Sequence, residues 1–146
     1  MTESVPQEIL DAIPHRPPFL LVDRIVERSD TRLVGEKTFT GEEAFFAGHY
    51  PGYPLVPGVL LCEAAMQCGA ILLSQQFVAA PDRVPVATRL NDVRLKRMVR
   101  PNETLRMEVE LTERLANAFF LTAKVTVAGT TAVRFQFACT AAPRGE

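Results

Sequence analysis

Two residues near the middle of the chain have side chains suited to acid–base chemistry, and both lie in unusual surroundings. His49 lies in a segment rich in glycine and proline, residues 48–58, whose backbone is stiff and cannot form regular structure. Glu63 lies near the start of an apolar stretch, beside Leu61 and Ala64. Burying a carboxylate among apolar neighbours is costly and raises its pKa, so Glu63 is a candidate proton donor near neutral pH.

A histidine base and a partly protonated carboxylic acid form a general acid–base pair. Such a pair suits the loss of water from a β-hydroxy carbonyl compound, because the base takes the α proton and the acid helps the hydroxyl leave. Charge develops on the carbonyl oxygen, which therefore needs preorganised donors. We expect these donors to be backbone N–H groups at the start of a helix, at Gly58 and Val59. Gln67, on the same helix face as Glu63, could bind its carboxyl group or a substrate.

Each of these residues also has a plainer interpretation. A glutamate in an apolar helix is more often a structural hydrogen-bonding residue or an interface residue, and a single loop histidine usually has no special role. A segment rich in glycine and proline before a helix is usually only a connection. His15, held between Pro14 and Arg16 with no acidic neighbour in sequence, is interpreted as structural.

The overall composition narrows the other possibilities. The 146 residues are 47% hydrophobic, which favours one globular domain, residues 1–146, with a substantial core. The formal net charge of −1 gives no general affinity for nucleic acid or anionic membranes. Two histidines without close spacing argue against a metal site, and there is no phosphate-binding loop or Gly-x-Ser-x-Gly motif. Three cysteines without metal-type spacing predict buried, reduced thiols in a cytoplasmic protein: Cys62, Cys68 and Cys139.

The predicted elements that must position His49 and Glu63 alternate in a simple order. We expect one helix over residues 59–77, apolar nearly all round, and strands over residues 19–28, 33–40, 85–99, 105–111, 119–127 and 133–139. Two strands, a buried helix and about four strands with short links predict an α+β fold, in which one antiparallel sheet wraps around the helix. Its uncovered edges predict a homodimer.

Neither the N-terminal residues nor the long apolar stretch predicts a membrane protein. The first residues, 1–7, lack the basic and apolar regions of a signal peptide. The apolar stretch 59–73 is interrupted by Glu63 and Gln67 and is judged too short and too polar to span a bilayer.

A run of basic residues, residues 94–100, falls at the end of the strand predicted over residues 85–99. On alternating positions, Arg94, Lys96 and Arg100 would share one face. The plainer interpretation is a solvated strand face, and the functional one is a landing patch for an acidic partner.

Three segments resemble the (3R)-hydroxyacyl-[acyl carrier protein] dehydratases of type II fatty acid synthesis. The first, residues 8–24, reads EILDAIPHRPPFLLVDR, and the second, residues 46–67, reads FAGHYPGYPLVPGVLLCEAAMQ. The third is the RLKR run at residues 94–97 followed by Pro101. The second is long and specific to the family, whereas the last third of the chain matches only in pattern.

The resemblance implies a hot-dog fold with active sites at a dimer interface, where His49 of one subunit faces Glu63 of the other. It implies no cofactor, and it implies a substrate carried on the phosphopantetheine arm of acyl carrier protein, an acidic partner. The basic residues expected to meet that partner are Arg94, Lys96 and Arg97. The family often assembles further, as a trimer of dimers. A glutamate at position 63, where a sister group of dehydratase/isomerases has aspartate, argues against double-bond isomerisation.

The chain departs from the family pattern at several positions. Tyr53 replaces a usual arginine, Pro17 a usual tyrosine and Tyr50 a usual phenylalanine, and residues 101–103 read PNE where Pro-Gly-Asp is usual. Two alternatives therefore stay open, a thioesterase on the same fold and a non-catalytic subunit that binds acyl carrier protein.

Overall fold

A single long helix, α2 (Gly58–Leu73), forms the centre of the molecule in a computed structural model that describes residues 4–144. Leucine, alanine and methionine favour helix here, and Pro57 precedes its first residue, where a helix can begin without a backbone donor. The helix tightens into the 3₁₀ helix η2 (Ser74–Phe77), where the Ser74 hydroxyl donates to the carbonyl of Ile71. The helix predicted over residues 59–77 therefore forms, with its last turn in 3₁₀ geometry.

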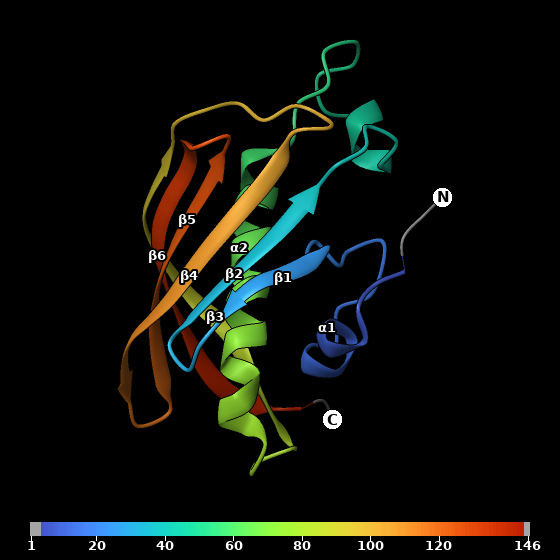
Figure 1. Cartoon of the computed structure of the whole chain (residues 1–146). Helices are drawn as coiled ribbons and strands as arrows, with labels where there is room; N and C mark the ends of the chain where they lie inside the picture. The colour runs from blue at the N-terminus through green and yellow to red at the C-terminus, as the bar shows by residue number, and fades with distance from the viewer. Residues whose placement is uncertain (1–3, 145–146) are drawn as a thin grey trace.

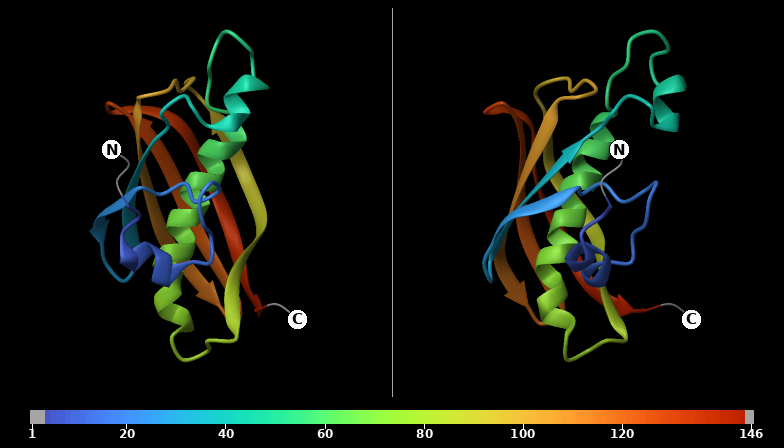
Figure 2. Two further views of the ribbon diagram at one scale, coloured as in Figure 1. Left: turned by 90° about the vertical axis from the view of Figure 1, so that its right-hand side faces the viewer. Right: turned by 45° about the vertical axis from the view of Figure 1, so that its right-hand side comes forward.

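Six antiparallel strands curve around this helix, as Figures 1 and 2 show. Their spatial order is β1-β2-β4-β5-β6-β3, so β1 and β3 are the two edges. The strands are β1 (Arg24–Arg28), β2 (Arg32–Thr38), β3 (Arg83–Leu95), β4 (Thr104–Leu115), β5 (Ala118–Val127) and β6 (Thr130–Pro143). The expected α+β architecture, one antiparallel sheet around one helix, is confirmed.

The core lies between the helix and the concave side of the sheet. Leu105, Met107 and Val109 alternate with polar residues along β4 and are fully buried, as their period of two predicts. The helix approaches the sheet closely at Gly69, where a Cβ would lie 2.7 Å from the ring of Phe137. A larger residue at position 69 would therefore push the helix away from the strands.

The N-terminal segment packs against the helix on the side away from the sheet (Figure 2). It contains a short helix, α1 (Gln7–Ala12), followed by extended chain up to β1. The buried amide of Gln67 holds it, because its oxygen accepts from the N–H of Leu21 at 2.7 Å and its nitrogen donates to the carbonyl of Phe19 at 2.9 Å. The N-terminal segment is thus clamped over α2.

Two predicted strands are shorter in the structure, for local reasons. The strand predicted over residues 19–28 pairs only from Arg24, because the Leu21 N–H is bound by Gln67 rather than by a neighbouring strand. The strand predicted over residues 85–99 ends at Leu95, because the N–H groups of Lys96 and Arg97 both turn to the carbonyl of Ala132. The expectation that Arg94, Lys96 and Arg100 share one strand face is therefore wrong.

The helical stretch Gly58–Phe77 is 20 residues long and, by length and composition alone, apolar enough to cross a membrane. The stretch judged too short and too polar from the sequence, residues 59–73, is shorter than the helical stretch that forms. Core helices of soluble proteins pass the same test, and 56% of the most apolar window of this stretch is buried inside the fold.

Candidate active site

His49 follows the 3₁₀ helix η1 (Ala44–Ala47) and opens a tight turn. Tyr50 and Gly52 have φ values of 53° and 83°, and the N–H of Tyr53 donates to the carbonyl of Tyr50 at 2.9 Å. The Nδ1 atom of His49 lies 2.9 Å from the carbonyl oxygen of Leu55. Because a carbonyl can only accept, Nδ1 carries the hydrogen, and the neutral ring keeps a free lone pair on Nε2. The loop thus fixes the orientation of the His49 ring.

The His49 cavity, as we call the hollow beside this ring, has a volume of about 580 Å³. The helix N-terminus contributes Gly58 and Leu61, and the end of β3 and the residues after it contribute Leu95, Lys96 and Met98. Gly58 permits a close approach, since a Cβ there would lie 2.9 Å from Leu95 Cδ1.

The first backbone N–H groups of α2, at Gly58 and Val59, are free to bind a ligand. No side chain caps the helix, and neither N–H forms a hydrogen bond within residues 4–144. Gly58 lines the His49 cavity, whereas the Val59 side chain is 73% exposed. The position expected for carbonyl-oxygen donors is therefore beside His49.

Glu63 is held from two directions. Gln67 Nε2 donates to Glu63 Oε2 at 2.9 Å, and His15 Nε2 lies 3.9 Å from the same oxygen. Glu63 Oε1 has no hydrogen-bond partner in the described part of the chain. The Glu63 side chain is 24% exposed, so the complete burial expected from its apolar neighbours is not reached in a single chain.

The Glu63 cavity, about 240 Å³, is lined by His15, Gln67, Ala70 and the start of β3. Beside it lies a hollow of about 500 Å³, which we call the helix-end groove, between the N-terminal segment and the C-terminal end of α2. The two share four lining residues: His15, Ala70, Pro85 and Val86. A largely apolar groove therefore continues from Glu63 toward Phe77.

His49 and Glu63 do not meet within one chain. Leu61 lines the His49 cavity, and Glu63 lines the Glu63 cavity. Positions two apart on a helix are rotated by about 200° around its axis, so Leu61 and Glu63 lie on opposite sides of α2. The two cavities touch opposite ends of β3, with Leu95 at one and Val86 at the other.

His15 differs from its sequence-based interpretation, whereas Gln67 forms one of the two contacts expected of it, the one with the Glu63 carboxyl group. Both N–H groups of the Gln67 amide bind protein acceptors, so its observed contact is with the Glu63 carboxyl group rather than with open cavity. His15, interpreted as structural because no acid is adjacent in sequence, lies beside Glu63. No local signal could have found this contact, since it is made by residues far apart along the chain.

The basic residues expected to meet an acidic partner are partly neutralised within the chain. Arg94 pairs with Asp92 at 3.0 Å, and Arg97 pairs with Glu103 at 2.7 Å. The hydrogen bond from Arg97 holds the pKa of Glu103 below its ordinary value. Lys96 forms no ion pair within residues 4–144 and lies at the His49 cavity.

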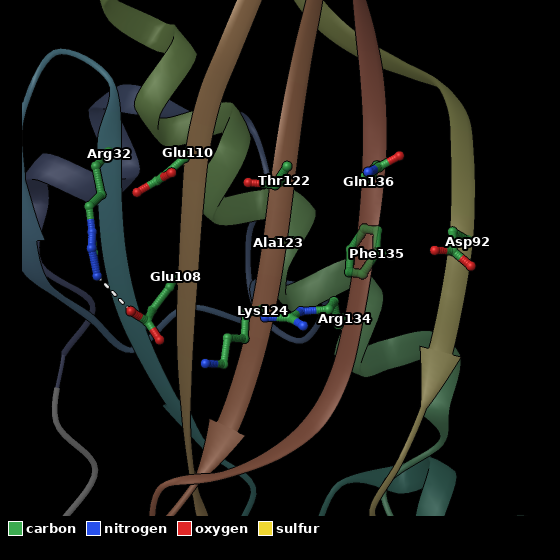
Figure 3. Close-up of a pocket in the computed structure, with 10 residues that line it drawn as sticks. All are labelled: Arg32, Asp92, Glu108, Glu110, Thr122, Ala123, Lys124, Arg134, Phe135 and Gln136. Carbon is green, nitrogen blue, oxygen red and sulfur yellow. Dashed lines mark hydrogen bonds and ion pairs between the residues drawn. The ribbon is translucent and has the colours of Figure 1, made fainter.

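A further hollow, of about 390 Å³, lies on the outer face of the sheet, away from α2 (Figure 3). It is lined by charged side chains from neighbouring strands, among them the Arg32–Glu108 ion pair at 2.6 Å. Neither His49 nor Glu63 reaches it.

All three cysteines are free and buried, as their sequence context predicts. Burial raises the pKa of the Cys139 thiol to about 11 and also raises the pKa values of the Cys62 and Cys68 thiols. They therefore stay thiols at neutral pH and do not supply a nucleophile. Within residues 4–144 no three His, Cys, Asp or Glu side chains are placed to hold a metal ion.

The architecture is that of the hot-dog proteins. The dehydratase heterocomplex ApeI:P from Xenorhabdus doucetiae superposes with a TM-score of 0.78 over 93% of this chain and 91% of that one, at 14% identity. At such low identity the likeness shows the fold alone.

Sequence relatives narrow the class further. The FabA-like domain model matches residues 13–136. The 3-hydroxyacyl-[acyl-carrier-protein] dehydratase FabZ of Herpetosiphon aurantiacus is 45% identical over 127 residues, covering 85% of this chain and 88% of that protein. The protein of the same name from Syntrophotalea carbinolica is 38% identical over 140 residues, 95% of each chain. The chain belongs to the FabZ family of 3-hydroxyacyl-[acyl-carrier-protein] dehydratases, which confirms the resemblance of its motifs.

Proposed function

We propose that this chain, acting as one domain over residues 1–146, dehydrates (3R)-3-hydroxyacyl groups on acyl carrier protein to trans-2-enoyl groups in type II fatty acid synthesis. His49 of one subunit and Glu63 of another form the acid–base pair. The observation that carries this proposal is that the cavities of the two residues lie at opposite ends of the same edge strand, β3.

Antiparallel pairing of β3 with its copy would join the two cavities. A two-fold axis near Asn91 sets Val86 of one subunit opposite Lys96 of the other, so each Glu63 cavity meets the partner's His49 cavity. The free edge of β3 carries exposed apolar side chains suited to such burial: Val86, Leu90, Val93 and Leu95. The homodimer would thereby cover an edge that otherwise invites aggregation.

The chemistry follows from the hydrogen bonds on the two residues. The free Nε2 of His49 takes the α proton, and the C–H electrons form the new carbon–carbon double bond. Glu63, in its acid form, donates its proton to the β hydroxyl, which leaves as water. The free N–H groups of Gly58 and Val59 stabilise the charge on the thioester oxygen. Solvent exchange returns the proton from His49 to Glu63, and no cofactor is required.

The remaining surfaces suit a carrier-bound acyl substrate. The groove that continues from Glu63 toward Phe77 would hold the acyl chain, and Lys96 would meet the acidic carrier at the His49 cavity. Arg94 and Arg97 would contribute less than predicted, because each already has a carboxylate partner. We place the enzyme in the cytoplasm, with a trimer of dimers as the higher assembly to test.

The first experiment follows the enoyl-thioester absorbance band during hydration, the reverse reaction. Wild-type protein and the Glu63→Gln variant would be mixed with crotonyl and longer trans-2-enoyl thioesters, on carrier protein and on coenzyme A. We expect the band to disappear with wild type and to persist with the variant, the rate falling about a hundredfold or more. Equal rates for both proteins would contradict the role of Glu63.

Two companion assays on the same protein address the alternatives. Release of free thiol from a saturated acyl thioester, without enoyl hydration, would favour the thioesterase. Binding of acyl carrier protein with no turnover at any chain length would favour the non-catalytic subunit.

A further inference from the structure

We propose that His15 is a positioning residue for Glu63, and that it fixes one carboxyl oxygen so that the other faces the substrate. This inference rests on the proposed function of the site. It starts from an asymmetry in the Glu63 carboxyl group. Oε2 is bound by Gln67 at 2.9 Å and faces His15 at 3.9 Å, whereas Oε1 has no hydrogen-bond partner in the described chain. Oε1 is therefore the oxygen available to the β hydroxyl.

The loop that carries His15 is held in place by the side chain of Arg16. The Arg16 guanidinium donates to the carbonyls of Leu10, Ile13 and His15 itself, at 2.9, 2.8 and 2.7 Å. The imidazole is stacked on Phe19, with ring centroids 6.3 Å apart and planes inclined by 21°. The ring therefore approaches Glu63 from the N-terminal segment, whereas Gln67 approaches it from the helix itself.

The polar atoms of His15 show which nitrogen carries its hydrogen. Nδ1 is buried and has no hydrogen-bond partner within residues 4–144. A hydrogen on Nε2 directs the single N–H of the neutral ring at a carboxylate oxygen, whereas a hydrogen on Nδ1 would be buried without an acceptor. We therefore assign the Nε2–H tautomer to His15, opposite to the Nδ1–H tautomer of His49.

At 3.9 Å the His15–Glu63 contact is longer than a hydrogen bond. Hydrogen bonds at catalytic sites are often long without substrate and shorten in the complex. Closure of the Glu63 cavity by β3 of a second subunit and by the acyl chain would remove solvent from this pair. The contact then sets the carboxyl orientation when the substrate is bound.

The first test compares His15→Phe, which keeps a stacked ring without an N–H, with His15→Gln, which keeps an N–H donor. We expect His15→Phe to lower kcat about 10- to 100-fold with little change in KM, since a small misplacement of a catalytic group has effects of that size. His15→Gln should recover most of kcat. Thermal unfolding should show both variants folded. Equal kcat for wild type and His15→Phe would overturn the proposal, as would equal losses in both variants.

The second test does not depend on activity. Long-range proton–nitrogen NMR of protein labelled with ¹⁵N in histidine reports the tautomer of each ring, and the chain has only two histidines to assign. We expect Nε2–H for His15 and Nδ1–H for His49. An Nδ1–H tautomer at His15 would overturn the assignment even in an active enzyme. The expected tautomers in a protein that hydrates no enoyl thioester would contradict the proposed function and leave the His15–Glu63 contact standing.

Discussion

The two cavities that contain the acid–base groups hold their polar side chains in different ways. The His49 ring is oriented by a carbonyl six residues away in the same rigid loop, that of Leu55. Glu63 is oriented by Gln67, one helical turn away, and by His15, which belongs to a separate segment. The proposed base is positioned by a contact within its own loop, whereas the proposed acid depends on how the N-terminal segment packs. Changes to that packing should therefore affect the acid more than the base.

The sharpest test of this comparison combines two inactive variants. His49→Ala and Glu63→Gln should each lose about a hundredfold or more in hydration rate. If each site takes His49 from one subunit and Glu63 from the other, subunit exchange between the variants restores one intact site in every mixed dimer. Half of the dimers are mixed at equal amounts, so about a quarter of wild-type activity should return. No recovery after demonstrated exchange would place both groups of a site in one subunit.

The next test disrupts the proposed dimer, so that the Glu63 cavity of one subunit no longer meets the His49 cavity of the other. Leu90→Arg places a charge in the middle of the free edge of β3, where Leu90 is 43% exposed. An unpaired charge is costly to bury at an interface, so we expect monomers in analytical ultracentrifugation and about a tenfold or greater loss of activity. The matched control is Val26→Arg on β1, the opposite edge, where Val26 is 45% exposed. A monomeric Leu90→Arg protein with full activity would show that a single chain contains a complete site.

A smaller change should affect only the Glu63 side. Ala70 lines both the Glu63 cavity and the helix-end groove, and Ala70→Leu would fill the passage between them. We expect hydration of crotonyl thioester within about threefold of wild type, and at least a tenfold drop in kcat/KM for trans-2-decenoyl thioester, because overpacking a filled channel costs on the order of 1–3 kcal/mol. Equal losses on both substrates would mean that the acyl chain lies elsewhere.

The smallest expected effect concerns the pair beside the His49 cavity. Arg97 lowers the pKa of Glu103, so this pair stabilises the fold above the carboxyl pKa of the unfolded chain. The stabilisation is lost as pH falls through the lower pKa of the folded state. Because both side chains are partly exposed to solvent, Glu103→Gln should lower Tm by only about 1–3 °C at pH 7, with the difference from wild type vanishing in strong acid. A difference that grows on acidification would contradict this sign.

The sequence by itself determined the order of elements and the family of this protein. The period of two along residues 105–111 and the apolar composition of residues 59–73 are local signals, and each produced the expected strand or helix. The motif around His49 and Glu63 identified the family because its residues are contiguous. The strands at residues 19–28 and 85–99 were predicted too long, because their ends are decided by hydrogen bonds to Gln67 and Ala132.

Only the tertiary structure decided which groups surround each predicted site residue. It placed His49 and Glu63 in separate cavities, brought His15 to Glu63, and directed Gln67 to an N–H group 46 residues away. It also paired Arg94 and Arg97 with carboxylates of the same chain. The physical reason is that these contacts join segments brought together by the packing of helix and sheet. Local periodicity reports which face of an element is buried and does not report what lies against it.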